Sequence, residues 1–244
     1  MTFTNIWNSG FLSQLVFAKA SSLYIAVGVS MIICIAAGYL LGSINASIII
    51  SGKLFKDDIR RHGSGNAGMT NVMRTYGKKM AVITFAGDFL KAVVSTLIGR
   101  VFFGYYGALL AGFFCFLGHI FPCYYRFKGG KGVVTAAAMI LMTDPLVCLI
   151  LFVLFVLIVW LTKYISAGSV ICLLLYPVIL NNLYTEFLGF PVLCAFAMGL
   201  LCAFAHRENL KRIFKGEENK FTFKVKDKKP VSEDNAESKE CSDE

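Results

Sequence analysis

The sequence predicts an all-α membrane protein, a polytopic bundle of about seven transmembrane helices. The chain is 57% hydrophobic and 16% charged, with a mean hydropathy of +0.66. Soluble domains are less apolar, at about 45–50%, and carry more charge, at about 25%. The apolar residues gather in runs that suit helices crossing a bilayer. The connections between these runs differ sharply in their content of Lys and Arg.

We assign the spans by following the apolar runs along the chain. The 244 residues suit one bundle. The first 22 residues contain one lysine, Lys19, and we interpret them as an extension and not as a signal peptide. The fourth run is short for a span of about 20 residues, so we expect a partial or tilted helix there. The seven runs are 23–50, 80–99, 105–123, 133–142, 146–161, 167–181 and 189–205.

The distribution of cations orients this bundle. One set of connections holds 21 of the 24 Lys and Arg residues. These connections are 53–79, 124–132, 163–166 and 206–244. The opposite set comprises 1–22, 100–104, 143–145 and 182–188, with turns expected at 143–145 and 181–182. By the positive-inside rule the cation-rich set is cytoplasmic, so we expect the N-terminus outside and the C-terminus inside. The net charge of +9 then reflects membrane topology and does not indicate a nucleic acid partner.

The eight cysteines do not predict a disulfide framework, because most lie inside apolar runs. We expect small buried side chains with free thiols. Residues 227–244, by contrast, are almost all charged or small, which predicts disorder. The chain therefore divides into an N-terminal extension (1–22), a membrane-embedded domain (23–221) and a charged cytoplasmic tail (222–244).

A glycine-rich polar loop, 62–79, follows the first apolar run. Glycines let backbone N–H groups turn toward an anion, and hydroxyl and amide side chains add further donors. Arg74 supplies a permanent cation whose fork matches phosphate oxygens. The loop thus predicts a phosphate cradle, and the alternative is a flexible linker. The candidate phosphate ligands are Gly63, Gly65, Asn66, Thr70 and Asn71. Four nearby cations are expected to face anionic lipid headgroups instead: Arg60, Arg61, Lys78 and Lys79.

A second glycine-rich loop, 128–132, opens into the fourth run. Such a loop at the start of a helix is a ready anion site, because free N–H groups and the positive dipole end meet there. The spacing differs from a Walker A loop, since glycine follows Lys131. The candidate ligands are Lys128, Gly129, Gly130, Lys131 and Gly132. His119, at the end of the preceding run, is expected to hydrogen-bond a neighbouring helix.

Three further features each have a structural alternative. Ser169, at the start of the sixth run, is equally typical of packing between membrane helices. His206 and Asn209 are three residues apart and share one helical face, although an amphipathic interfacial segment would show the same pattern. Asp88 and Lys91, inside the second run, are expected to neutralise each other.

In this order, the motifs resemble those of the bacterial acyl-phosphate:glycerol-3-phosphate acyltransferases, from about Gly38 to Phe221. The matching motifs are G-S-I near Ser43, G-S-G-N-x-G-x-T-N-V-x-R at 63–74, G-H-x-F-P at 118–122, F-K-G-G-K-G-V-x-T at 127–135 and H-R-E-N at 206–209. Asn45 and Ala67 stand where proline is common in the family, which puts the rigidity of the first loop in question.

The resemblance implies an enzyme of the bacterial cell membrane with seven helices and a cytoplasmic active site. It implies transfer of a fatty acyl group from an acyl phosphate to glycerol 3-phosphate, giving lysophosphatidic acid and inorganic phosphate in the first step of phospholipid synthesis. Carried onto matching positions, it places six residues in the active site: Ser64, Arg74, Lys131, Ser169, His206 and Asn209.

The general base stays open between His206 and a phosphate of the substrate. The His-x-x-x-x-Asp dyad of thioester-using acyltransferases does not occur in this sequence. Neither carboxylate clusters nor His/Cys ligand spacing occurs, so we expect no metal and no cofactor. Two other classes remain as alternatives, a carrier or channel for a phosphorylated solute and a non-catalytic membrane scaffold.

Overall fold

The computed structural model describes residues 20–184 and 189–221, and every regular element within them is helical. The predicted extension (1–22) lies outside the described residues except for its last three, which begin the first labelled helix. The charged tail (222–244), including Cys241, also lies outside them. The seven described cysteines are free, as predicted.

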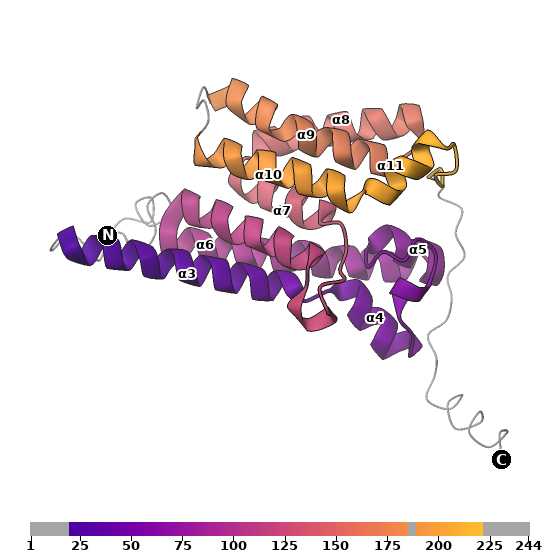
Figure 1. Cartoon of the computed structure of the whole chain (residues 1–244), viewed down its shortest axis with the longest axis horizontal. Coiled ribbons are helices and arrows are strands. Elements are labelled where there is room, and N and C mark those ends of the chain that lie inside the picture. Colours follow the sequence, from indigo (N-terminus) through magenta and orange to yellow (C-terminus); the bar gives the residue numbers. More distant parts are fainter. Residues whose placement is uncertain (1–19, 185–188, 222–244) are drawn as a thin grey trace, which may run out of the picture.

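The described part of the chain contains both long and short helices (Figure 1). The long helices are α3 (Ala20–Ser43), α6 (Lys78–Ile120), α8 (Pro145–Thr162), α9 (Ile165–Tyr184) and α10 (Phe190–Ala205). The short helices are α4 (Ala46–Phe55), α5 (Met69–Tyr76), α7 (Val133–Thr143) and α11 (Arg207–Phe214). Two 3₁₀ turns, η1 (Ile59–Arg61) and η2 (Cys123–Tyr125), lie in the glycine-rich connections.

Helix α6 consists of two antiparallel arms. Phe103 and Gly104 leave helical geometry, with φ of −139° and 58°. The Ser95 hydroxyl donates to the carbonyl oxygen of Ala111 at 2.9 Å, which requires the chain to reverse between them. This reversal coincides with the connection predicted at 100–104, so the second and third apolar runs are separate arms.

The first apolar run, predicted as one span over 23–50, is instead interrupted where α3 ends at Ser43. Asn45 causes the interruption, because its side chain accepts hydrogen bonds that compete with those of a continuous helix. Its Oδ1 accepts from the N–H of Ile48 at 3.2 Å and from the Ser47 hydroxyl at 2.7 Å, which caps α4.

Among the described residues, four helices are long and apolar enough to cross a membrane, or five if α10 and α11, bent by 59°, form one span. The predicted runs correspond in order to α3, the two arms of α6, α7, α8, α9 and α10. The count is lower than seven because it takes the two arms of α6 together as one helix and leaves out α7, which has 11 residues. The number of spans and their orientation remain predictions.

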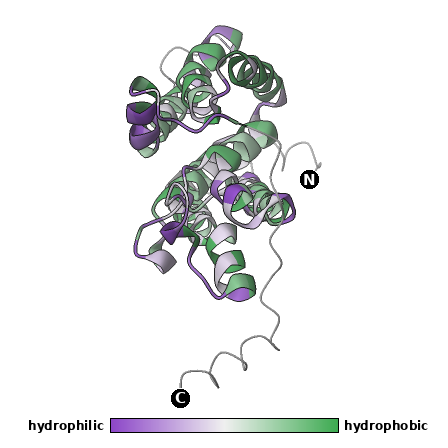
Figure 2. Ribbon diagram, turned by 90° about the vertical axis from the view of Figure 1, so that its right-hand side faces the viewer, coloured by the Kyte–Doolittle hydropathy of each residue, from purple (hydrophilic) through white to green (hydrophobic). Residues whose placement is uncertain are grey.

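The connections gather at two ends of the bundle, as the charge pattern predicts. Helices α4, α5 and α11 lie at the same end of the bundle (Figure 1), and a view onto that end shows hydrophilic ribbon in front of hydrophobic helices (Figure 2). At the other end the predicted turn at 143–145 is present, with Pro145 as the first residue of α8. The turn predicted at 181–182 is wrong, because α9 continues to Tyr184.

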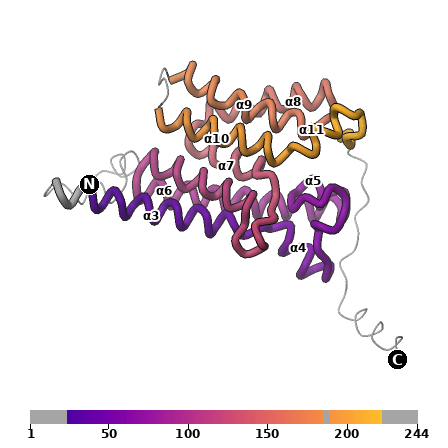
Figure 3. The backbone as a smooth tube through the Cα atoms, viewed as in Figure 1, coloured from indigo at the N-terminus to yellow at the C-terminus, as the bar shows by residue number. Residues whose placement is uncertain are grey.

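The first glycine-rich loop has a small core of its own. Ile59, Ala67 and Val72 are fully buried and pack with Ile50, Tyr76 and Met80. The larger core lies between the second arm of α6 and helices α7 to α10. Figure 3 shows the connection from α6 to α7 descending toward α4, so the two glycine-rich loops meet beside this small core. The first loop is therefore a folded unit and not a flexible linker.

Asp88 and Lys91 form the predicted ion pair, with Lys91 Nζ 3.0 Å from Asp88 Oδ1. Lys91 Nζ also lies 2.9 Å from His119 Nδ1, so His119, on the second arm of α6, bonds the neighbouring first arm, in line with the prediction. Lys91 donates to the carbonyl of Gly42 at 2.9 Å, and Asp88 accepts from the N–H of Ala46 at 3.4 Å. A cation thus lies at the carboxyl end of α3 and an anion at the amino end of α4, where each complements the helix dipole.

Candidate active site

The side chain of Asn71 shapes the first glycine-rich loop. Its Nδ2 donates to the carbonyls of Ile59 and His62 at 3.1 and 2.8 Å, and its Oδ1 accepts from the N–H of Ser64 at 3.0 Å. Gly63 adopts a φ of 56°, and a Cβ there would collide with Asn71 Oδ1. These contacts occupy the amide and favour a role in shaping the loop, so its direct contact with a phosphate remains a prediction.

The remaining predicted phosphate ligands of this loop differ in exposure. Ser64 is exposed together with Gly63 and Gly65, whereas Asn66 and Thr70 are half-buried. Ser64 is thus accessible to a ligand, and its part in a site remains a prediction.

The second glycine-rich loop is tied to the end of α6. The N–H of Gly129 donates to the carbonyl of Ile120 at 3.2 Å, and the N–H of Gly130 donates to that of His119 at 3.0 Å. These two N–H groups fix the loop, whereas the sequence led us to expect free donors at a helix start. The groups suited to an anion are those of the first turn of α7, which begins at Val133, because they have no intrahelical acceptor. The side chain of Lys128 is exposed.

The side chain of Lys131, near the end of this loop, contacts the C-terminal segment that contains α11. Its Nζ donates to Oδ1 of Asn209, and Asn209 Nδ2 donates to Oε1 of Glu218 at 2.7 Å. Glu218 also accepts from the Ser166 hydroxyl at 3.0 Å and from Nε of Arg212 at 2.8 Å. Segments that are far apart in the sequence, at the start of α7, in α9 and in α11, therefore share one chain of polar contacts.

The pKa values of the cations in this cluster are set mainly by burial and are modified by the neighbouring charges. Burial, opposed by the charge of Glu218 and reinforced by Arg212 and Arg74, lowers the pKa of Lys131 to about 8. Burial also lowers the pKa of Arg74, which the same Glu218 and Arg212 charges influence. Burial alone would raise the pKa of Glu218, but hydrogen bonds from Asn209, Arg212 and Ser166 hold it below its usual value. Glu218 is therefore an ionised carboxylate that partly compensates three cations.

His206 and Ser169 lie beside this cluster. His206 is 3% exposed, and its Nδ1 lies 2.9 Å from the carbonyl oxygen of Cys202. A carbonyl oxygen accepts and does not donate, so the proton is on Nδ1 and the Nε2 of a neutral ring carries the free lone pair. The Cys202 thiol lies 4.0 Å from the carbonyl oxygen of Ser169, and the Ser169 hydroxyl donates to the carbonyl of Ile165 at 2.9 Å.

Five of the six predicted catalytic residues thus gather at one end of the bundle: Arg74, Lys131, Ser169, His206 and Asn209. The structure adds Glu218 and Arg212, which sequence analysis missed. Arg212 follows Asn209 by one helical turn, and that spacing is a signal for a shared face. Glu218 had no such signal, because the sequence does not distinguish it from the neighbouring Glu217.

The opposite end of the bundle contains a cavity of about 160 Å³ lined by Tyr105, Asp144, Leu180, Tyr184, Pro191 and Val192. It is separated from the cluster by the length of α9 and α10, since it adjoins the C-terminal end of α9. Among residues 20–184 and 189–221, no three His, Cys, Asp or Glu side chains gather as a metal site would require.

Long apolar helices and a cation-rich, donor-rich cluster at one end define an integral membrane protein with a site suited to anionic groups. The family described as glycerol-3-phosphate acyltransferase matches residues 32–216. A glycerol-3-phosphate acyltransferase of Finegoldia magna is 42% identical over 183 residues, covering 75% of this chain and 91% of that one. One of Syntrophotalea carbinolica is 39% identical over 198 residues, covering 79% and 98%.

The fold agrees with these relatives. The crystal structure of PlsY, an integral membrane glycerol 3-phosphate acyltransferase, in its glycerol 3-phosphate form is similar with a TM-score of 0.72. It is 34% identical and covers 79% of this chain and 96% of its own. Its lysophosphatidic acid form gives a TM-score of 0.69. The chain belongs to the glycerol-3-phosphate acyltransferase family, and it is a membrane-integral acyltransferase of the PlsY-like type.

Proposed function

We propose that the protein transfers a fatty acyl group from an acyl phosphate to the 1-hydroxyl of sn-glycerol 3-phosphate. The products are lysophosphatidic acid and inorganic phosphate, as in the first step of phospholipid synthesis. The observation that carries the proposal is the convergence of Arg74, Lys131 and Asn209 at one polar end of an apolar bundle. Relatives named for glycerol-3-phosphate acylation and a similar structure in a glycerol 3-phosphate form support the acceptor.

The chemistry requires little beyond positioning and charge compensation. An acyl phosphate is a mixed anhydride, so its carbonyl carbon is already electrophilic and phosphate is a good leaving group. Both substrates are anions that repel each other, and Arg74 and Lys131 would compensate them while N–H groups of α7 stabilise developing oxyanion charge. Ser64 and Ser169 would orient the phosphates, and His206 with Asn209 would close the site.

The acceptor hydroxyl oxygen forms the new bond to the carbonyl carbon, and the bond between that carbon and the phosphate oxygen breaks. The hydroxyl proton passes to a phosphate oxygen of the substrates, and inorganic phosphate leaves with the bonding electrons. His206 is the other candidate base, because its Nε2 has a free lone pair in the neutral ring. Replacement of His206 by Gln decides between them: turnover near background, with binding intact, would eliminate the substrate phosphate as the base.

We further propose seven spans in the inner membrane of a bacterial cell, with the polar end on the cytoplasmic side. The excess of Lys and Arg at that end supports this orientation. It predicts that a position just beyond α11 faces the cytoplasm and that a position near the reversal of α6 faces outward.

The orientation is tested by labelling single introduced cysteines with an impermeant thiol reagent in intact cells. Lys215→Cys is exposed beyond α11 and should be protected, whereas Tyr106→Cys, at a position 49% exposed near the α6 reversal, should be labelled. The unmodified protein is the control, because its native cysteines set the background. Equal labelling of the two variants would reject the orientation.

The assay of function uses detergent-purified protein with radiolabelled glycerol 3-phosphate and, in parallel, palmitoyl phosphate or palmitoyl-CoA. We expect lysophosphatidic acid with the acyl phosphate, loss of product in Lys131→Ala, and wild-type product in Lys215→Ala, whose side chain is exposed. Product with the thioester would keep the reaction class and reject the acyl phosphate donor.

A carrier for a phosphorylated solute is the second candidate, favoured by the interruption between α3 and α4 beside the buried Asp88–Lys91 pair. Detergent removes every compartment, so product formation there would exclude transport as the main function. Uptake of glycerol 3-phosphate into vesicles without chemical change would favour the carrier instead.

A further inference from the structure

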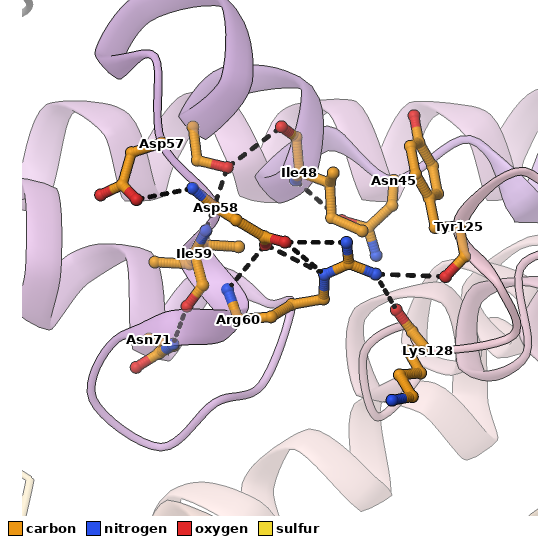
Figure 4. A network of polar contacts seen from close by, with 10 residues as sticks. Asn45, Ile48, Asp57, Asp58, Ile59, Arg60, Asn71, Tyr125 and Lys128 are labelled. Carbon is orange, nitrogen blue, oxygen red and sulfur yellow. Dashed lines mark hydrogen bonds and ion pairs between the residues drawn. The ribbon is translucent and has the colours of Figure 1, made fainter.

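Arg60 joins the two glycine-rich loops. Its Nε and Nη2 donate to the carboxylate of Asp58 at 3.0 and 2.8 Å, and its Nη1 donates to the carbonyls of Tyr125 and Lys128 at 3.1 and 3.3 Å (Figure 4). The sequence led us to expect Arg60 at lipid headgroups, and that expectation is wrong, because its fork is already occupied by protein groups. The neighbouring Arg61 is exposed.

The segment from which Arg60 extends is held by further hydrogen bonds. Asp58 Oδ1 accepts from the N–H of Arg60 at 3.0 Å and caps η1. Ile59 is fully buried, its N–H donates to the Ser51 hydroxyl at 3.2 Å, and its carbonyl accepts from Asn71 at 3.1 Å (Figure 4). Since Ser51 belongs to α4 and Asn71 to α5, Arg60 projects from a segment fixed to both helices.

The segment that Arg60 holds has an unfavourable backbone. Arg126 and Phe127 adopt φ of 56° and 57°, a left-handed conformation that residues other than glycine adopt at an energetic cost. The two carbonyls that Arg60 binds, those of Tyr125 and Lys128, lie on either side of this pair. A guanidinium suits the position, because its planar fork donates to a carboxylate and to carbonyls at once, which an ammonium does less well.

We propose that Arg60 is a positioning residue that fixes the loop carrying Lys131 relative to Arg74. Lys131 follows Lys128 by three residues, and Arg74 lies on α5, to which the base of Arg60 is fixed through Asn71. Lys131 and Arg74 have the same charge, so in the unliganded protein they repel each other. The Arg60 contact resists this repulsion and keeps the anion site formed before substrate arrives.

This inference rests on the proposed function and makes a distinct kinetic prediction. When Arg60 is removed, the phosphates of the substrates can still draw the two cations together, but binding must supply the ordering energy. We expect KM for glycerol 3-phosphate to rise about tenfold in Arg60→Ala, while kcat changes less than about threefold. A loss of folded protein alone would lower the apparent kcat and leave KM unchanged.

The experiment compares wild type, Arg60→Ala, Arg60→Lys and the matched control Arg61→Ala. It measures steady-state kinetics and hydrogen–deuterium exchange of residues 121–132 without substrate. We expect faster exchange and a higher KM in Arg60→Ala, intermediate values in Arg60→Lys, and wild-type values in Arg61→Ala. Equal KM and exchange in Arg60→Ala and Arg61→Ala would overturn the proposal.

If Arg60→Ala does not fold, Arg60→Lys decides, because it keeps the charge and loses the fork. Wild-type KM and exchange in Arg60→Lys would overturn the proposal, and a raised KM with faster exchange would support it. A wild-type protein without acyltransferase turnover would reject the proposed function, and the exchange comparison would still test the contact.

Discussion

Replacing Glu218 by Gln should loosen the C-terminal segment and impair the site. Glu218 is 8% exposed and accepts from Ser166, Asn209 and Arg212 at 3.0, 2.7 and 2.8 Å. Hydrogen bonds to a charged group contribute about 1.5–3 kcal/mol, roughly twice the value of neutral ones. Three bonds that each lose about 1 kcal/mol give a destabilisation of about 3 kcal/mol. In a chain of this size that corresponds to about 6–12 °C in melting temperature.

The effect on activity should follow from Asn209. The amide of a glutamine has one acceptor oxygen, so it cannot receive all three donors of the carboxylate. Asn209 would then no longer be held with its Oδ1 toward Lys131, and we expect kcat/KM to fall at least about tenfold. The matched control is Glu217→Gln, because Glu217 is exposed.

The assay measures thermal unfolding in detergent and lysophosphatidic acid formation for both variants. A segment that opens locally would reduce activity without changing the melting temperature, so both quantities are needed. If Glu218→Gln matched Glu217→Gln in kcat/KM and, to within about 2 °C, in melting temperature, the reasoning would be refuted.

Three further predictions concern single groups. The pKa of Lys131 is lowered to about 8, and its cation is the form that binds anions, so kcat/KM should fall as pH rises through about 8. A pH profile of kcat/KM measures this fall, and Lys131→Arg should remove it. Lys91→Met should remove the lysine that pairs with the buried Asp88 and cost about 3–5 kcal/mol, whereas the double variant with Asp88→Asn should be milder. A double variant less stable than Lys91→Met would contradict this. Asn45→Ala should lose a helix cap of about 1 kcal/mol and lower the melting temperature by about 2–4 °C; an unchanged melting temperature would argue against the cap.

The sequence predicted the all-helical membrane bundle and the end at which the polar connections meet. Both can be predicted from the order of residues along the chain, because the length of apolar runs and the positions of cations do not depend on tertiary contacts. The hairpin inside α6 was predicted for the same reason. The break at Asn45 was not, because a single amide in an apolar run competes with the helix only when its own partners are in place.

The site was predicted as a set of residues and not as a set of contacts. Glycine-rich loops indicated backbone donors, but Gly129 and Gly130 donate to α6. The departure from proline at Asn45 and Ala67 put the rigidity of the loop in question, yet Asn45 Nδ2 donates to the carbonyl of Ala67 at 3.3 Å. A hydrogen bond therefore joins these two positions, which are 22 residues apart in the sequence. The sequence pattern of one segment does not show which residue of another segment it will contact.

The charge of the cluster explains why an acyltransferase for anionic substrates contains a buried carboxylate at all. Without Glu218, the cations Arg74, Lys131 and Arg212 would lose the buried carboxylate that compensates part of their charge. The carboxylate of Glu218 accepts hydrogen bonds from Arg212 and Asn209, and the side chain of Asn209 in turn contacts Lys131. The carboxylate thus offsets part of the positive charge, although burial, with smaller contributions from Arg212 and Arg74, still lowers the pKa of Lys131. Under the proposed function, the phosphate of a substrate would supply further negative charge, and relief of the mutual repulsion of the cations would favour its binding.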